Sequence, residues 1–180
     1  QRQMCIRDRV YTPFHGCGWK LVPEALRGLG VKNLYCVEQQ MVLDGTFPTV
    51  ASPNPENPEG FYLAIELADK VGADFILGTD PDSDRVGIMV RGADGKFIAV
   101  TGNQTGVLLL DYLIGAMRRA GKMPEHPYFL KTIVTTEMAR KVAESNGVTC
   151  CDTFTGFKFM AEKKNALEAA GEGHVIMSYE

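Results

Sequence analysis

Short apolar runs alternate with longer segments of helical spacing along this chain, and the same order occurs in both halves. In the first half, strands are expected at Val10–Thr12, Leu34–Val37 and Ala73–Leu77. The segments between them, Trp19–Leu29 and Pro58–Val71, have the apolar spacing of helices that cover a sheet. Strand–helix–strand order favours parallel pairing, because parallel strands need a crossover connection. The chain is therefore predicted to be an α/β protein.

A hairpin is expected to extend the first sheet. The Asp94–Gly95 pair is a strong turn signal between the apolar runs Val86–Arg91 and Phe97–Val100, so the sheet is predicted to be mixed. The apolar residues expected on one face of the first helix are Leu21, Ala25, Leu26 and Leu29.

The second half repeats the same plan after a boundary expected near Thr101–Asn103. Helices are expected at Thr105–Ala120, Glu137–Asn146 and Gly156–Ala170, and strands at Phe129–Thr135, Val148–Asp152 and His174–Tyr179. Thr136 is a favourable N-cap for its helix. The apolar residues of the long helix are Val107, Leu108, Leu110, Leu113, Ile114 and Met117. We therefore expect two consecutive α/β domains with mixed sheets covered by helices, residues 10–100 and 101–180.

Composition narrows the function classes. A net charge of −3 gives no signal for nucleic-acid binding, and no apolar run approaches the ~20 residues of a membrane span. The five cysteines show no C-x-x-C spacing, which favours reduced thiols in the cytoplasm. Residues 1–9 have no helical or strand period and resemble translated adapter sequence, so we expect them to be foreign or disordered. Together with the abrupt end at Glu180, this suggests an incomplete reading frame.

Three aspartates, Asp80, Asp82 and Asp84, alternate with other residues directly after an apolar run. Alternation in an extended loop would place their carboxylates on one side, where they repel one another unless a cation lies among them. Oxygen ligands of this kind suit Mg²⁺. A solvated turn is the alternative, since Pro and Ser are common turn residues. A calcium EF-hand is excluded, because Arg85 and Arg91 occupy the positions that need Gly and Glu.

Several other polar residues can be interpreted either as functional or as structural. Arg85 follows the acidic loop, where a guanidinium can bind phosphate in bidentate fashion. Ser52 is predicted to be structural, since no His or Lys lies near it in sequence to act as its base. His15 is expected to be a turn or interface residue. Thr155 and Gly156 form either a helix cap or a loop that lets a ligand approach the backbone. Lys158 either faces that site or lies on a solvated helix face.

Four stretches together resemble one known family. Gly78–Arg85 resembles the metal-binding loop of the α-D-phosphohexomutases, the superfamily of phosphoglucomutases and phosphomannomutases. Tyr11–Gly16 and Ser52–Glu56 are similar to second-domain segments of the phosphoglucomutase and phosphopentomutase branch. Thr155–Phe159 resembles the third-domain loop near the sugar, and Glu180 stands where a sugar-recognition loop begins. The resemblance covers the second domain and part of the third, and places the phosphoserine and the phosphate-binding domain outside this chain.

The resemblance implies an intramolecular phosphotransferase, an isomerase that converts glucose 1-phosphate to glucose 6-phosphate through a phosphoserine and a bisphosphorylated sugar. It implies one Mg²⁺ on Asp80, Asp82 and Asp84, and a catalytic role for Arg85. The residues implied to bind the sugar phosphate are Thr155, Gly156, Lys158 and Glu180. A bisphosphorylated sugar is the implied activator, and no nucleic-acid or membrane partner is expected. A phosphopentomutase, a phosphomannomutase and a non-catalytic metal-binding α/β module are the alternatives.

Overall fold

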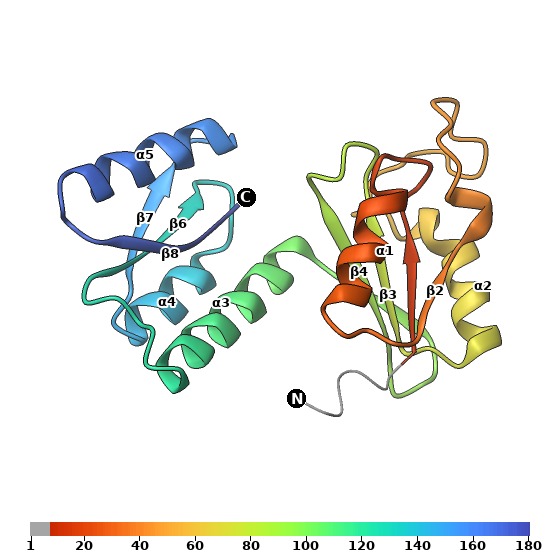
Figure 1. Ribbon diagram of the computed structural model, residues 1–180, viewed down its shortest axis with the longest axis horizontal. Helices are drawn as coiled ribbons and strands as arrows, with labels where there is room; N and C mark the ends of the chain where they lie inside the picture. The colour runs from red at the N-terminus through yellow and green to blue at the C-terminus, as the bar shows by residue number, and fades with distance from the viewer. Residues whose placement is uncertain (1–7) are drawn as a thin grey trace. The chain divides into compact units, whose positions relative to one another are not determined.

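The computed structural model describes residues 8–180 and divides into two compact units, one ending at Gly102 and the other beginning at Asn103 (Figure 1). Most of the segment expected to be foreign, residues 1–7, lies outside the described residues. Among the described residues, no helix is long and apolar enough to cross a membrane.

The first unit contains a five-stranded mixed sheet in the order β2-β1-β3-β4-β5. The strands are β1 (Arg9–Thr12), β2 (Leu34–Cys36), β3 (Phe75–Thr79), β4 (Val86–Arg91) and β5 (Phe97–Val100). Strand β1 lies between β2 and β3 and is parallel to both, whereas β4 is antiparallel to both β3 and β5. The predicted parallel core with an added hairpin is therefore confirmed, and Gly95 has the positive φ, 82°, that this turn requires.

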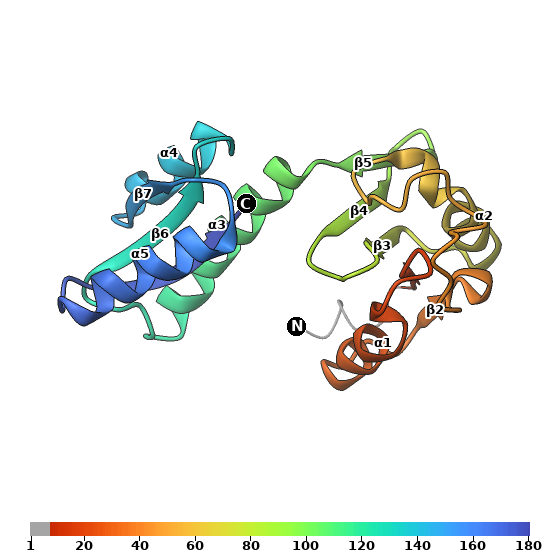
Figure 2. The ribbon, with the colours of Figure 1, turned by 90° about the horizontal axis from the view of Figure 1, so that it is seen from above.

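Helices α1 (Gly18–Gly28) and α2 (Tyr62–Val71) lie on opposite sides of this sheet (Figure 2), and the short 3₁₀ segments Glu38–Gln40 and Pro58–Phe61 lie between them in sequence. The apolar core lies on the α2 side. Its buried members include Val10, Phe14, Phe61, Ala64, Ala68, Ile76 and Met89. Gly72 ends α2 in the left-handed conformation with φ +73°, as its sequence position predicts.

The expected buried face of α1 is wrong. Leu21 is 70% exposed and Leu29 is 81% exposed, while the buried residues of this helix are Gly18 and Pro23. The face of α1 that packs against the rest of the unit therefore contains Gly18 and Pro23, and it is rotated about the helix axis from the predicted apolar face. Apolar spacing alone did not distinguish these neighbouring faces.

The second unit contains a parallel three-stranded sheet, β6 (Pro127–Thr132), β7 (Thr149–Thr153) and β8 (His174–Tyr179), in the order β7-β6-β8. Its helices are α3 (Gly102–Arg119), α4 (Glu137–Ser145) and α5 (Phe157–Ala169). As in the first unit, the first strand of the sheet lies between the second and the third. The predicted repetition of topology is confirmed.

Alternate residues of the second sheet face two separate cores. Phe129 and Cys150 pack with Leu110 of α3 and Ala143 of α4, whereas Leu130 packs with Met160 and Leu167 of α5. The predicted N-cap is also confirmed, since the Thr136 hydroxyl accepts a hydrogen bond of 3.2 Å from the Met138 amide. Among the six apolar residues expected on the long helix, Leu108 is 64% exposed, because Leu110 and Ile114 form the side that packs.

Candidate functional site

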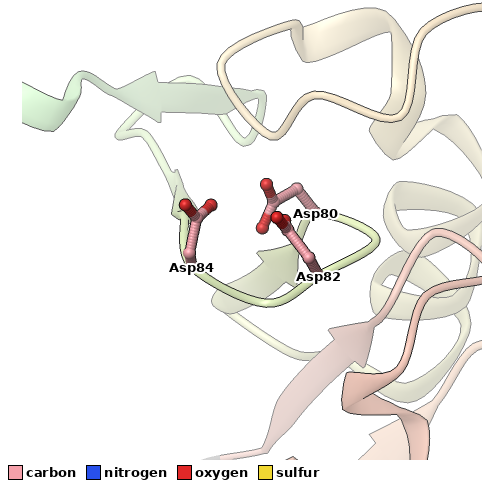
Figure 3. Close-up of side chains that lie close together, drawn as sticks. All are labelled: Asp80, Asp82 and Asp84. Atoms are coloured by element: carbon pink, nitrogen blue, oxygen red, sulfur yellow. The ribbon is translucent and has the colours of Figure 1, made fainter. Parts of the chain in front are cut away.

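The acidic loop begins at the carboxyl end of β3, the central strand of the five-stranded sheet. One carboxylate oxygen from each of Asp80, Asp82 and Asp84 lies within 4.8 Å of the others. Figure 3 shows the three carboxyl groups directed toward a common space above the loop. The geometry therefore brings together the residues that the sequence proposes as metal ligands.

The loop achieves this by a tight turn and not by the extended alternation that the sequence suggested. The Ser83 amide donates to the Asp80 carbonyl at 3.1 Å, and Ser83 has a φ of +61°. The Arg85 amide then donates to Asp80 Oδ1 at 2.9 Å. The chain therefore folds back on itself, and Asp84 approaches Asp80 from the far side of the turn (Figure 3).

The three carboxylates lie in different surroundings. Asp80 is buried, with 7% of its surface exposed, whereas Asp82 and Asp84 are exposed. Burial raises the pKa of the Asp80 carboxyl above its ordinary range; the Arg85 amide opposes this, and the nearby Asp82 and Asp84 add to the rise. Crowded oxygen donors with one anchored and two exposed carboxylates fit a hard divalent cation such as Mg²⁺, which takes few protein ligands and keeps water.

Arg85 lies beside the acidic residues. Its Nε is 4.0 Å from Asp80 Oδ2 and 3.9 Å from Asp84 Oδ1, and 59% of its side chain is exposed. These separations are long for ion pairs, so the guanidinium is held loosely and its donors remain accessible to an anion.

In the second unit, two of the four residues proposed to bind sugar are joined directly. The Gly156 amide donates to Glu180 Oε2 at 2.8 Å. Gly156 has a φ of +114° at the start of α5, which requires glycine. Thr155 is exposed beside it. Lys158 is exposed, and its Nζ lies 4.8 Å from the centroid of the Phe159 ring.

Ser52 and His15 have structural partners, in agreement with their predicted roles. The Ser52 hydroxyl accepts a hydrogen bond of 3.0 Å from Asn57 Nδ2. His15 is buried, and its Nδ1 and Nε2 each lie 2.9 Å from a partner, the Val42 carbonyl and the Thr49 hydroxyl.

Sequence reasoning overlooked Lys131, whose side chain is wholly buried at the end of β6. Its Nζ lies 2.7 Å from Glu137 and 3.0 Å from Asp152, and it also donates to the carbonyls of Thr132 and Thr135. Burial alone would lower the pKa of Lys131, but the two carboxylates reverse this and raise it. A lysine directly after the apolar pair Phe129–Leu130 was the available signal.

Family comparisons agree with this fold. Residues 7–95 match the model of the phosphoglucomutase/phosphomannomutase α/β/α domain II, and residues 101–179 match that of domain III. The phosphoglucomutases of Staphylococcus aureus strains MRSA252 and USA300 are each 38% identical over 159 residues, 88% of this chain. The chain spans 28% of the length of these relatives.

Solved structures share the fold. A phosphoglucomutase/phosphomannomutase family protein of Burkholderia thailandensis gives a TM-score of 0.67 at 20% identity, covering 92% of this chain and 32% of its own. The N-acetylphosphoglucosamine mutase of Aspergillus fumigatus, in complex with GlcNAc-6P and magnesium, gives 0.62 at 13% identity, covering 89% and 33%.

The fold and the acidic loop thus define a pair of α/β domains with a carboxylate cluster at a strand end. The chain belongs to the phosphoglucomutase/phosphomannomutase family and contains its domains II and III.

Proposed function

We propose that this chain supplies the Mg²⁺-binding domain and a sugar-binding domain of a phosphoglucomutase-type enzyme. That enzyme would convert glucose 1-phosphate to glucose 6-phosphate through a phosphoserine and a bisphosphorylated sugar, which would also serve as activator. The observation that carries the proposal is the convergence of Asp80, Asp82 and Asp84 at the end of β3, within the region that matches family domain II. The identity to phosphoglucomutases supports the reaction.

In this proposal Asp80, Asp82 and Asp84 hold the Mg²⁺. The ion, when bound, would supply positive charge that stabilises a phosphoryl group during transfer. Asp80 is the anchored ligand, because the Arg85 amide fixes its Oδ1. Asp82 and Asp84 are exposed and complete the donor set, Asp82 beside Asp80 and Asp84 from the far side of the turn (Figure 3). The Arg85 guanidinium, loosely held and accessible, would bind phosphate oxygens.

The sugar phosphate would be bound partly by the second unit. The Gly156 amide orients the Glu180 carboxylate, which is a suitable acceptor for sugar hydroxyls. Thr155 and Lys158 are exposed and offer a hydroxyl and an ammonium group. A cytoplasmic location, one Mg²⁺ per chain and the absence of nucleic-acid and membrane partners belong to the same proposal.

Other members of the superfamily act on different sugars, and the 38% identity to phosphoglucomutases favours glucose phosphate over pentose or mannose phosphate. A non-catalytic metal-binding module is disfavoured by the acidic loop itself. Burial, and then the neighbouring Asp82 and Asp84, raise the pKa of Asp80, so the charged cluster is unfavourable without a cation, and a retired site has no reason to keep it.

Metal titration tests the proposal. The 180-residue chain is titrated with Mn²⁺ and the free ion is followed by electron paramagnetic resonance, with Mg²⁺ as competitor. Saturable binding is expected, and Asp82→Asn should abolish it. Glu56→Gln, which neutralises an exposed acid of the same unit, is the control and should bind like wild type. Equal binding by Asp82→Asn and the control would contradict the ligand assignment.

A further inference from the structure

The turn between β1 and α1 packs directly against the acidic loop. The Cys17 amide donates to the Pro81 carbonyl at 2.8 Å, and the Cys17 thiol donates to the Ser83 hydroxyl at 3.6 Å. The Gly16 amide closes the turn on the Pro13 carbonyl at 2.7 Å. Segments far apart in sequence are therefore tied together by backbone contacts on the loop that carries the three aspartates.

Two glycines make this approach possible. A Cβ added to Gly16 would lie 2.4 Å from Pro81 Cα and 2.9 Å from the Asp80 carbonyl oxygen. A Cβ added to Gly18 would lie 2.6 Å from both the Ser83 hydroxyl and the Tyr11 hydroxyl. The contacts at Gly16 are with backbone, so a side chain there has no room unless the acidic loop moves.

A chain of hydrogen bonds fixes the turn from its other side. The Val42 carbonyl can only accept, so His15 Nδ1 carries the proton and Nε2 accepts from the Thr49 hydroxyl. The Thr49 hydroxyl in turn accepts from Gln40 Nε2 at 3.0 Å, and the Thr12 hydroxyl donates to Gln40 Oε1. The His15 amide donates to the Gln40 carbonyl at 3.0 Å.

The turn needs this support, because its backbone is strained. Phe14 and His15 have φ values of +45° and +64°, a region that residues with a Cβ seldom adopt. Such a conformation persists only where surrounding contacts determine it. His15, Thr12 and Gln40 are all buried, so their hydrogen bonds are costly to break.

We propose that the His15–Gly18 turn is a positioning element for the acidic loop, holding Asp80, Asp82 and Asp84 in their converging arrangement before any cation binds. His15 and Gly16 are positioning residues that act through Asp80 and Pro81. The inference rests on the proposed metal-binding role of the loop, but its first measurement needs no metal.

The test compares Gly16→Ala with Gly28→Ala in the 180-residue chain. A Cβ at Gly28 meets nothing within 4 Å, so it is the matched control. Hydrogen exchange of the Ser83 and Arg85 amides is measured by NMR without metal, because both bond to Asp80. Gly16→Ala should speed their exchange about tenfold or more while the β3 amides keep wild-type rates. Mn²⁺ affinity should fall about tenfold or more, and the control should change neither quantity.

A second pair of variants decides the matter if Gly16→Ala does not fold. Thr49→Val removes the hydroxyl that His15 Nε2 accepts from, whereas Thr46→Val removes an exposed hydroxyl that donates to the Asp44 carboxylate. Thr49→Val should change the ring ¹⁵N shifts of His15 and speed exchange at Ser83 and Arg85, and Thr46→Val should do neither. Wild-type exchange in Thr49→Val, or in a folded Gly16→Ala, would overturn the proposal. If wild type binds no Mn²⁺, the proposed function fails, yet the exchange rates still decide whether the turn positions the loop.

Discussion

At the scale of single residues, the acidic loop places three like charges closer together than stability favours. Asp80 is buried, and its raised pKa reports that its charged form is disfavoured. The sequence predicted which residues converge, because three aspartates within five positions have few other arrangements. It did not predict how, since the left-handed Ser83 and the bond from the Arg85 amide to Asp80 leave no pattern in the sequence.

Removing one charge from the loop should therefore stabilise the metal-free chain. In the presence of a chelator, Asp82→Asn is expected to raise the thermal unfolding midpoint of the first unit, because it relieves repulsion around Asp80. Fluorescence of Trp19, the single tryptophan, reports on this unit. Glu56→Gln serves again as control. With saturating Mg²⁺ the order should reverse, since only wild type gains stability from binding. A lower midpoint for Asp82→Asn in the chelator would show that the charges do not oppose folding.

Cys150 should make the second unit sensitive to alkali. Burial raises the pKa of its thiol to about 11. The unfolded chain therefore loses this proton at lower pH than the folded chain, and stability is lost as pH rises from about 9 to about 11, by roughly 2 kcal/mol. Urea unfolding followed by far-ultraviolet circular dichroism, under reducing conditions, measures this. Cys150→Ala should remove much of the pH dependence, whereas Cys151→Ala should keep it. Identical slopes in the two variants would contradict the assignment to Cys150.

At the scale of elements, sequence spacing predicted the strands and helices well but not which side of each helix is buried. The stripe Leu21, Ala25, Leu29 on α1 has regular helical spacing and is exposed, while Pro23 is buried. On α2 the expected apolar face is buried, since Ala64 and Ala68 belong to the same buried cluster as Phe61. Apolar periodicity predicts that a helix has a buried face, but tertiary contacts determine which of several neighbouring faces is buried.

Lys131 shows a second limit of prediction from sequence, because it joins three elements whose contact no sequence pattern indicates. Its buried ammonium meets Glu137 at the start of α4 and Asp152 on β7. In the double variant Glu137→Gln/Asp152→Asn, the ammonium keeps only carbonyl partners, and the thermal midpoint of the second unit should fall clearly. Adding Lys131→Met should restore much of the loss, because it removes the uncompensated charge.

The exposed pair Lys164 and Glu168 is the control for this experiment, and Glu168→Gln should leave the midpoint nearly unchanged. Circular dichroism melting curves of all variants are compared at neutral pH. If the triple variant is no more stable than the double variant, the loss does not come from the charge on Lys131.

At the scale of the whole chain, the sequence predicted that the second unit repeats the strand–helix order of the first, and in both sheets the first strand lies between the second and the third. This succeeded because strand–helix alternation constrains connectivity strongly. The contacts between the His15–Gly18 turn and the acidic loop could not be predicted. They join residues about 65 positions apart through backbone atoms, at glycines where a side chain would not fit, and sequence patterns do not indicate such long-range packing.

A polypeptide of these 180 residues alone should have no mutase activity. Phosphoryl transfer needs a nucleophile held in line with the phosphate and the cation. Among the described residues near the acidic loop, Ser83 lies within the loop itself, where its hydroxyl accepts from Cys17. The Ser52 hydroxyl accepts from Asn57, and both ring nitrogens of His15 have partners, so neither is poised as a phosphoryl carrier or its base. The positioning groups are therefore present, while Ser83, Ser52 and His15 are each engaged in other hydrogen bonds.

The assay is conversion of glucose 1-phosphate to glucose 6-phosphate with Mg²⁺ and glucose 1,6-bisphosphate, together with a search for covalently bound radioactive phosphate. A full-length Staphylococcus aureus phosphoglucomutase is the positive control. The chain should show neither turnover nor labelling, even where the titration shows that it binds Mn²⁺. Turnover that rises with chain concentration would place a nucleophile within these residues. If Ser52→Ala then abolished the labelling, the structural role assigned to Ser52 would be wrong, and its bond to Asn57 would have to open during the reaction.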